Sequence, residues 1–367
     1  MARAIELASR GQGHVEPNPM VGCVIVRDGA VVGEGWHRTF GGPHAEVEAL
    51  RVAGTRAKNS AAYVTLEPCC HHGKTPPCTQ ALINAGIVKV VCAQRDPFPE
   101  VGGKGIAALQ AAGIDVEVGL MGLEARRLNA PYLKLVTTGR PWIIAKWAMT
   151  LDGKIATATG DSRWISGEAS REIVQQLRGR VDGILVGHGT AKTDDPLLTA
   201  RPAGPRMATR IVVDSRAALS PDAQLVRTAR GAPVLVAAGA AAPQNNISQL
   251  TAAGCEVIAC RSANSTQSDT AGRFVSIPAL LDELGRRRMT NVLVEGGSKL
   301  LGTLFDAGAI DEVHVFIAPK LIGGANAPSP IAGVDLEKIA ASLSVVDIEL
   351  RHVGEDIYLH GRINRNS

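Results

Sequence analysis

Short apolar runs separated by turn-forming residues recur along the chain, and they predict strands. Residues 21–26 and 30–36 predict the two strands of a hairpin, because Asp28 followed by Gly29 between apolar runs is a strong turn signal. Further short strands are predicted at residues 62–66, 88–93 and 114–118. The segments between them have helical apolar spacing, and this alternation predicts a three-layer α/β sandwich.

The pattern after residue 140 also favours an α/β fold, with strands that join in a mixed sheet. Ser166 is a good N-cap and predicts a helix that runs to about Gly179. Residues 190–201 are interpreted as a loop, and the polar stretches 242–246 and 262–270 as surface loops. The predicted strands are residues 142–148, 184–187, 210–214, 233–237, 256–260, 291–294, 312–319, 344–350 and 356–360.

A boundary between two domains is predicted near Arg140. Residues 123–135 have the spacing of one helix, and the turn-forming segment 137–141 follows it. A chain of 367 residues exceeds what one hydrophobic core usually supports. We therefore expect one domain at residues 1–139 and a second at 140–367.

Composition and charge narrow the class of protein. The chain is 45% hydrophobic and 20% charged, with a net charge of +4 and no basic tract long enough to follow a phosphate backbone, so nucleic acid is not an expected partner. No apolar run approaches the roughly 18 residues of a membrane span, and the first eight residues lack the unbroken apolar run of a signal peptide. The odd number of cysteines, seven, favours a reducing compartment. We expect a cytoplasmic protein.

Candidate metal ligands lie between residues 44 and 78. One histidine, His44, and two cysteines, Cys69 and Cys78, form a set that suits zinc and leaves a fourth position open for water. Glu46 follows the histidine by two residues and would transfer protons beside the metal rather than bind it. His44 and Glu46 are expected in the first turn of a helix, where the helix dipole favours negative charge. This is the signature of the zinc deaminases.

The alternative is a closed structural zinc site. His71 or His72 would then supply a fourth ligand, and the metal would only hold a loop together. That alternative leaves Glu46 without a role. Cys70 is interpreted as a bystander, because a third thiolate would reduce the Lewis acidity of the metal.

The spacing of the motifs resembles one branch of the deaminases. Eight residues separate Cys69 from Cys78, the segment before the second cysteine reads G-x-T-P-P-C, and Asn18 lies in a P-N-P turn. The second half contains K-x-A-x-T-L-D-G, S-x-W-I-S, D-D-P-x-L-x-x-R and V-E-G-G in that order. Together these motifs resemble the bifunctional riboflavin-biosynthesis deaminase/reductase family across nearly the whole chain. Cys70 and Thr150 stand where that family more often has serine.

The resemblance implies a cytidine-deaminase-like domain followed by a dihydrofolate-reductase-like domain, with zinc and NADPH as cofactors. It implies contacts to the cofactor NADPH from Ala148, Trp164, Thr190, Asp194, Ser215, Gly297, Ser298, Lys299, Leu300, Leu301, Gly302 and Thr303. It implies contacts to substrate from Asn18, His37, His71, Lys74, Ser162, Arg178, Leu198, Arg201 and Glu295. Lys74 and the arginines would suit a phosphorylated sugar.

The implied activity has two steps on a small phosphorylated pyrimidine. Zinc-dependent deamination of 2,5-diamino-6-(5-phosphoribosylamino)pyrimidin-4-one comes first, and NADPH-dependent reduction to 5-amino-6-(5-phosphoribitylamino)uracil follows. One alternative is a nucleoside or tRNA deaminase with an unrelated C-terminal domain, and another is a zinc-stabilised binding protein. The sequence leaves open whether the chain forms a homo-oligomer.

Overall fold

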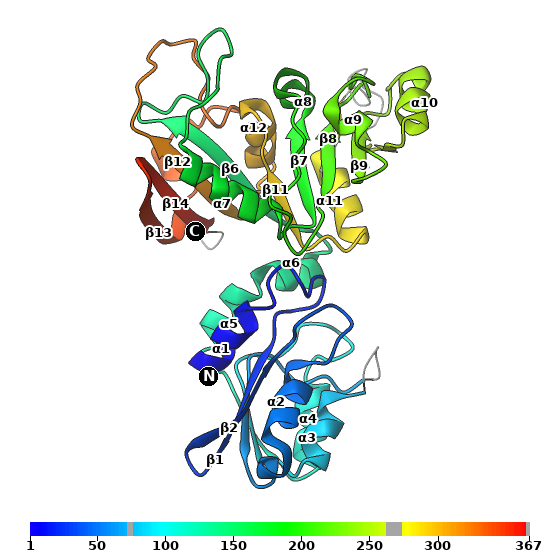
Figure 1. The fold of residues 1–367 in the computed structure, drawn as a ribbon, viewed down its shortest axis with the longest axis vertical. Coiled ribbons are helices and arrows are strands. Elements are labelled where there is room, and N and C mark those ends of the chain that lie inside the picture. Colours follow the sequence, from blue (N-terminus) through cyan, green and yellow to red (C-terminus); the bar gives the residue numbers. More distant parts are fainter. Residues whose placement is uncertain (72–75, 262–273, 365–367) are drawn as a thin grey trace. The chain divides into compact units, whose positions relative to one another are not determined.

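The computed structural model describes residues 1–71, 76–261 and 274–364, and it divides into two compact units. The first unit is Met1–Arg140 and the second is Pro141–Ser367, so the division falls one residue after the boundary expected from the sequence. Each unit has its own sheet (Figure 1) and its own buried apolar clusters.

The first unit, in its described residues, is built on one five-stranded sheet in the order β2-β1-β3-β4-β5. Its first three strands in this order pair antiparallel, and β3, β4 and β5 pair parallel. The strands are β1 (Gly22–Arg27), β2 (Ala30–Trp36), β3 (Ala61–Val64), β4 (Lys89–Cys92) and β5 (Asp115–Val118). The predicted hairpin is confirmed, with Asp28 and Gly29 at positive φ in the turn between β1 and β2.

Helices cover both faces of this sheet, which confirms the three-layer sandwich (Figure 1). Cys23 and Ile25 of β1 are buried in the cluster that contains α2, whereas Val24 of the same strand packs with α1. The helices are α1 (Ala2–Ser9), α2 (Ala45–Ala53), α3 (Cys78–Asn84), α4 (Lys104–Ala111), α5 (Gly122–Leu128) and α6 (Ala130–Thr138), with the 3-10 helix η1 (Gly54–Ala57) after α2.

Glycines in β2 let the backbone of α2 lie directly on the sheet. A Cβ atom added at Gly33 would overlap the Ala49 carbonyl oxygen, and one added at Gly35 would overlap the Ala49 nitrogen and the Ala45 oxygen. The packed interior has no room for such atoms. This contact fixes the position of the first turn of α2, which carries the candidate metal ligand and Glu46.

The single helix predicted at residues 123–135 is two helices. Asn129 separates α5 from α6, and its side chain accepts a hydrogen bond from the backbone N–H of Met20 and donates one to the Met20 carbonyl oxygen, both at 2.8 Å. Pro131 follows in the first turn of α6, where its missing N–H costs nothing. A long-range contact therefore interrupts a helix that local spacing would continue.

The second unit, in its described residues, holds a nine-stranded mixed sheet in the order β10-β9-β8-β7-β11-β6-β12-β14-β13. All neighbours from β10 to β12 pair parallel, and β14 pairs antiparallel with both β12 and β13. The strands are β6 (Trp142–Thr150), β7 (Gly183–Gly187), β8 (Thr209–Val213), β9 (Val234–Ala238), β10 (Glu256–Ala259), β11 (Asn291–Val294), β12 (Glu312–Ala318), β13 (Val345–Val353) and β14 (Asp356–Ile363).

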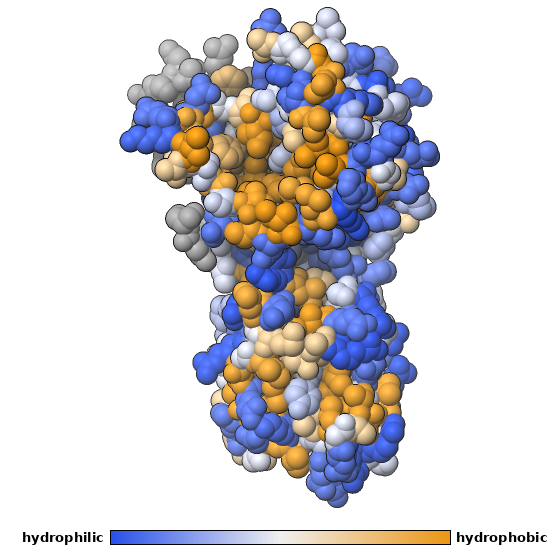
Figure 2. Space-filling model, turned by 90° about the vertical axis from the view of Figure 1, so that its left-hand side faces the viewer, coloured by the Kyte–Doolittle hydropathy of each residue, from blue (hydrophilic) through white to orange (hydrophobic). Residues whose placement is uncertain are grey.

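Helices cover the two faces of this sheet and bury two large apolar clusters (Figure 1). The helices are α7 (Glu168–Arg178), α8 (His188–Asp194), α9 (Gln224–Arg227), α10 (Gln244–Ala252), α11 (Ile277–Arg286) and α12 (Ser298–Asp306), with the 3-10 helix η2 (Ile339–Ala341) before β13. The strand β13 lies at the edge of the sheet, and Ile348 and Leu350 on it are exposed. Figure 2 shows apolar surface on the side of the unit where this edge lies.

Three expectations for the second unit are wrong. The helix α8 covers residues 190–194 of the segment interpreted as a loop, and the predicted surface loop at residues 242–246 contains the start of α10. In α8 only Ala191 is buried, so apolar spacing gives no helical signal. The N-cap of α7 is Gly167 and not Ser166, because the carboxylate of Asp356 accepts hydrogen bonds from the Gly167 N–H and the Ser170 hydroxyl. The predicted loop at 262–270 lies outside the described residues.

No helix among the described residues is long and apolar enough to cross a membrane.

Candidate active sites

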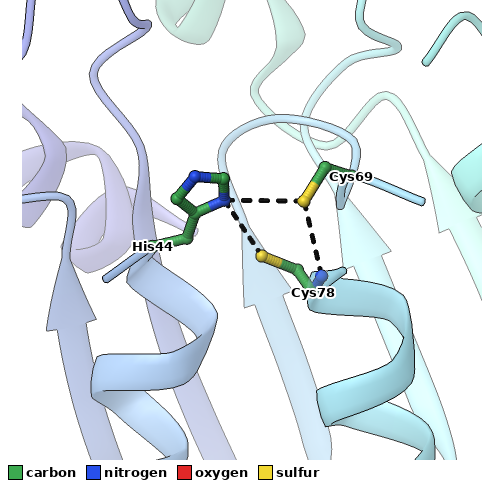
Figure 3. Close-up of side chains that lie close together, drawn as sticks. All are labelled: His44, Cys69 and Cys78. Carbon is green, nitrogen blue, oxygen red and sulfur yellow. Dashed lines mark hydrogen bonds between the residues drawn. The ribbon is translucent and has the colours of Figure 1, made fainter. Parts of the chain in front are cut away.

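The three candidate zinc ligands converge in the first unit. Nδ1 of His44 lies 3.1 Å from Sγ of Cys78 and 3.5 Å from Sγ of Cys69, and the ligand atoms are all within 4.8 Å of one another (Figure 3). Two thiolates and an imidazole are the donors that zinc prefers. The set therefore fits a zinc ion bound by three protein ligands.

Helix ends bring these ligands together. His44, expected in the first turn of a helix, is the N-cap of α2. Cys78 is the first residue of α3, and Cys69 follows β3 (Figure 3). The Cys78 N–H donates to Sγ of Cys69 at 3.3 Å. Hydrogen bonds from Cys78 and His44 lower the pKa of Cys69, while the neighbouring Cys69 sulfur and burial raise the pKa of Cys78. The site thus stabilises a thiolate at Cys69 before metal binds.

Glu46 lies in the first turn of α2 and is only 3% exposed. Burial, together with the charge of Cys69, raises the pKa of Glu46 to about 7. A carboxyl group with a pKa near the working pH can both accept and donate a proton. Its position beside the ligands therefore suits a general acid/base.

Two predicted substrate residues lie beside the metal ligands. Nε2 of His37 is 3.3 Å from the Asn18 side-chain nitrogen, and Nδ1 of His37 is 3.0 Å from the Pro43 carbonyl oxygen. The His37 and His44 rings meet edge to face with centroids 5.3 Å apart. These contacts form a polar wall next to His44.

The remaining predicted residues of this site lie on the segment between the cysteines. His71 is half-buried, and its ring centroid lies 6.4 Å from that of Phe98. Lys74 lies outside the described residues. Cys70 is half-buried and is not in the cluster of candidate ligands.

The candidate residues of the second unit gather at the carboxyl edge of its parallel strands. Ala148 lies near the end of β6, Glu295 follows β11, Thr190 lies in the helix after β7, and Ser215 follows β8. These four strands are neighbours in the order β8-β7-β11-β6. Ligands of parallel α/β sheets bind at this edge.

The N-terminus of α12 suits a phosphate of a nicotinamide cofactor. Gly297 is its N-cap, with no side chain to cap the free N–H groups of the first turn, and the Gly297 N–H donates to Oγ1 of Thr190 at 3.1 Å. Unpaired N–H groups at a helix start bind phosphate. Residues 297–303, predicted to hold NADPH, thus form the N-cap and the first turns of α12, and the N-cap is hydrogen-bonded to α8.

Arg178 and Glu295, both predicted to contact substrate, form a buried ion pair. The guanidinium donates two hydrogen bonds to the carboxylate, at 2.6 and 2.9 Å. Burial alone would raise the pKa of Glu295, but the Arg178 charge holds that pKa below its usual value. Burial lowers the pKa of Lys146, and Glu295 opposes this shift. Lys146 belongs to the motif K-x-A-x-T-L-D-G, and its charge within an otherwise apolar strand is the signal in the sequence that could have identified it.

The other predicted residues of the second unit are more exposed, with one exception. The Trp164 ring is 66% exposed, and the Arg171 guanidinium lies over it. The Asp194 carbonyl oxygen accepts a hydrogen bond from Arg163. The exposed residue Arg201, the half-buried Ser162 and the buried Leu198 complete the predicted set. Within the described residues, neither Trp164 nor Arg201 forms a hydrogen bond with Arg178 or Glu295.

A pair that the sequence analysis did not single out lies beside Thr190 in α8. Nδ1 of His188 is 3.0 Å from a carboxylate oxygen of Asp214, which precedes Ser215. Each residue directly follows a parallel strand, and that placement is the signal that could have found the pair.

Comparison with known proteins shows similarity across both units. Residues 141–359 match the family described as RibD C-terminal domain, and residues 1–94 match the cytidine and deoxycytidylate deaminase zinc-binding region. The riboflavin biosynthesis protein RibD of Actinobacillus pleuropneumoniae is 42% identical over 98% of this chain and 93% of its own length. RibD of Escherichia coli strain K12 is 43% identical over 98% of this chain and 97% of its own length.

Solved structures agree with these matches. Acinetobacter baumannii RibD superposes with a TM-score of 0.85 at 36% identity, covering 99% of this chain and 98% of that chain. A diaminohydroxyphosphoribosylaminopyrimidine deaminase/5-amino-6-(5-phosphoribosylamino)uracil reductase from Thermotoga maritima superposes with a TM-score of 0.80 at 35% identity, covering 99% of this chain and 97% of that chain.

Proposed function

Because the chain belongs to the RibD family of bifunctional deaminase/reductases of riboflavin biosynthesis, we propose the roles of its individual residues in the two reactions. The first unit is the zinc-dependent deaminase and the second is the NADPH-dependent reductase. The match of residues 141–359 removes the alternative of a deaminase with an unrelated C-terminal domain.

We propose that the substrate is 2,5-diamino-6-(5-phosphoribosylamino)pyrimidin-4-one, in keeping with the name of the Thermotoga maritima relative. His44, Cys69 and Cys78 would hold zinc, which when bound would supply Lewis acidity and activate a water for attack on the amino-bearing carbon. Glu46 would carry one proton of that water to a ring nitrogen and the second to the amino group, so that the C–N bond breaks and ammonia leaves as the carbonyl forms. Asn18 and His37 bind the pyrimidine beside the metal, and His71 and Lys74 contact the ribose phosphate.

In the reductase, NADPH when bound would supply a hydride to ribose carbon C1, and the sugar oxygen that leaves C1 would take a proton from water, which gives the ribityl chain of 5-amino-6-(5-phosphoribitylamino)uracil. The N-terminus of α12, with Thr190 beside it, would hold the cofactor's phosphates. Glu295 holds the Arg178 guanidinium toward substrate, and the exposed Arg201 contacts the phosphate. We propose that the remaining predicted cofactor and substrate residues contribute to the same site.

The strongest structural support for the proposed deaminase site is the burial of Glu46 beside three candidate metal ligands that lie close together. Glu46→Gln keeps the shape and a hydrogen-bonding group but removes the proton carrier, so ammonia release should fall about 10²–10⁴-fold. Oxidation of NADPH with the already deaminated substrate should stay near wild type in the same variant. Undiminished ammonia release would contradict the role of Glu46.

The cellular location and the partners of the chain are predictions from its sequence. A cytoplasmic location and the absence of nucleic-acid partners are proposed from the composition of the chain.

A further inference from the structure

A second cluster of metal-binding side chains lies in the second unit, and none of its members has a role in the proposal above. Glu312 and His314 are two residues apart on β12, and His360 pairs directly opposite His314 on β14. Side chains two apart on a strand point to the same face of the sheet. The ligand atoms of all three residues lie within 4.8 Å of one another.

Both imidazoles direct the same nitrogen at one carboxylate oxygen. Oε1 of Glu312 lies 2.8 Å from Nε2 of His314 and 2.9 Å from Nε2 of His360. The two rings lie side by side, with centroids 4.5 Å apart and 32° between their planes. Zinc binds histidine nitrogen and carboxylate oxygen at about 2.0–2.2 Å, so small side-chain rotations would bring the three atoms around one ion.

Two of the three side chains have a hydrogen-bond partner that orients them, and the third has a carboxylate nearby. The Tyr358 hydroxyl is 2.7 Å from Nδ1 of His314, and the Trp142 indole N–H donates to Oε2 of Glu312 at 2.8 Å. The Glu349 carboxylate lies 3.9 Å from Nδ1 of His360. In metal sites, partners of this kind fix the tautomer of the histidine and the direction of the ligand.

Burial also suits an ion at this place. Glu312 is 8% exposed and His314 is 2% exposed, whereas the His360 side chain is 25% exposed and offers a route from solvent. A divalent cation would compensate the buried carboxylate charge. The competing arrangement is a metal-free network in which both imidazoles donate Nε2–H to Glu312.

We propose that Glu312, His314 and His360 bind one divalent transition-metal ion, such as Zn²⁺ or Co²⁺, in the second unit. Two imidazoles and a carboxylate are a ligand set for first-row metals of this kind. The ion would link β12 to β14 and stabilise the end of the sheet where the antiparallel strands begin.

Cobalt distinguishes this site from the deaminase site. Full-length protein with zinc at Cys69 and Cys78 is titrated with Co²⁺, followed by absorption spectroscopy and metal analysis. We expect one additional Co²⁺ per chain, with weak visible bands and without the sulfur-to-cobalt absorption that a thiolate site would give. The added ion should also raise the melting temperature of the second unit, because it binds only the folded state.

Single substitutions locate the ion. His314→Gln and the less buried His360→Gln should each abolish the additional cobalt, whereas His352→Gln, at an exposed histidine on β13, should retain it. Tyr358→Phe keeps all three ligands and should weaken cobalt binding about 10–100-fold. Circular dichroism of each variant without cobalt checks that it folds.

Two results would overturn the proposal. One is the absence of additional cobalt in folded wild-type protein, which would leave the metal-free network as the correct description. The other is cobalt uptake that folded His360→Gln does not reduce, which would assign the ion to other surface groups.

Discussion

At the scale of single residues, both candidate sites contain ionisable groups whose pKa values are shifted by burial and by neighbouring charges. Glu46 and Cys69 share a small volume with His44, and the pKa of Glu46 rises to about 7 because of burial and the sulfur charge. In the second unit, Arg178 and Glu295 neutralise each other out of water. In each site the distance to one charged neighbour, Cys69 for Glu46 and Arg178 for Glu295, contributes to the pKa of the carboxyl group.

Cys69→Ser should remove the deaminase zinc. Serine is a poor zinc ligand, and metal binding is linked to folding of the surrounding loop, so the first unit should also melt at a lower temperature. Metal analysis should show one zinc fewer per chain than wild type. The matched control is Cys70→Ser at the adjacent half-buried cysteine, which should retain the full zinc content. Equal losses in the two variants would contradict the ligand assignment.

Glu295→Ala should destabilise the second unit by about 3 kcal/mol, because it leaves the Arg178 guanidinium buried without its partner. The double variant Arg178→Met/Glu295→Leu should lose less than the sum of the single changes. Denaturant unfolding followed by tryptophan fluorescence measures this, since Trp142, Trp147 and Trp164 all lie in the second unit. Additive losses would show that the two side chains do not interact.

At the scale of elements, helix starts bring distant residues together. The candidate zinc ligands depend on where α2 and α3 begin, and the cofactor residues depend on where α12 begins. Close packing fixes these positions. Gly33 and Gly35 let α2 lie on β2, and Gly105 lets α4 lie against the Pro68 carbonyl just before Cys69.

Gly35→Ala should displace α2 and weaken both stability and deamination. The added methyl group overlaps backbone atoms of Ala45 and Ala49, and overpacking of this kind typically costs about 1–3 kcal/mol. Zinc affinity should fall as well, because His44 begins the displaced helix. Gly102→Ala in the same unit adds a methyl group at ordinary contact distance and serves as the control. The measurements are thermal unfolding, zinc content and ammonia release. If Gly35→Ala has wild-type values in all three, close packing of α2 on β2 does not position His44.

At the scale of the whole molecule, the two units have separate sheets and separate apolar cores. The candidate zinc ligands all lie in the first unit, and the residues proposed for NADPH all lie in the second. The two reactions therefore use different parts of one chain.

Fragments 1–140 and 141–367 should each fold when produced separately, because each retains its own core. The first fragment should bind zinc and release ammonia from the substrate, and the second should bind NADPH and reduce the deaminated product. Circular dichroism and the two activity assays check this. Failure of both fragments to fold would show that the two cores depend on each other.

The sequence by itself determined the helices and strands that depend on neighbouring residues alone. The hairpin at Asp28 and Gly29, the helix starts at His44 and Cys78, and the strands of both sheets follow from turn chemistry and apolar spacing. The spacing of His44, Cys69 and Cys78 predicted the cluster that the structure shows, because each of these residues lies at a helix start or after a strand.

Only the tertiary structure decided the element boundaries and residue pairings that depend on contacts between distant parts of the chain. Asn129 ends α5 because its side chain pairs with Met20, more than 100 residues away, and Asp356 sets the start of α7. The predicted strands at 312–319 and 356–360 already contained Glu312, His314 and His360. Their convergence required the register of β12 with β14, which fixes the residues that face one another and which no local pattern specifies.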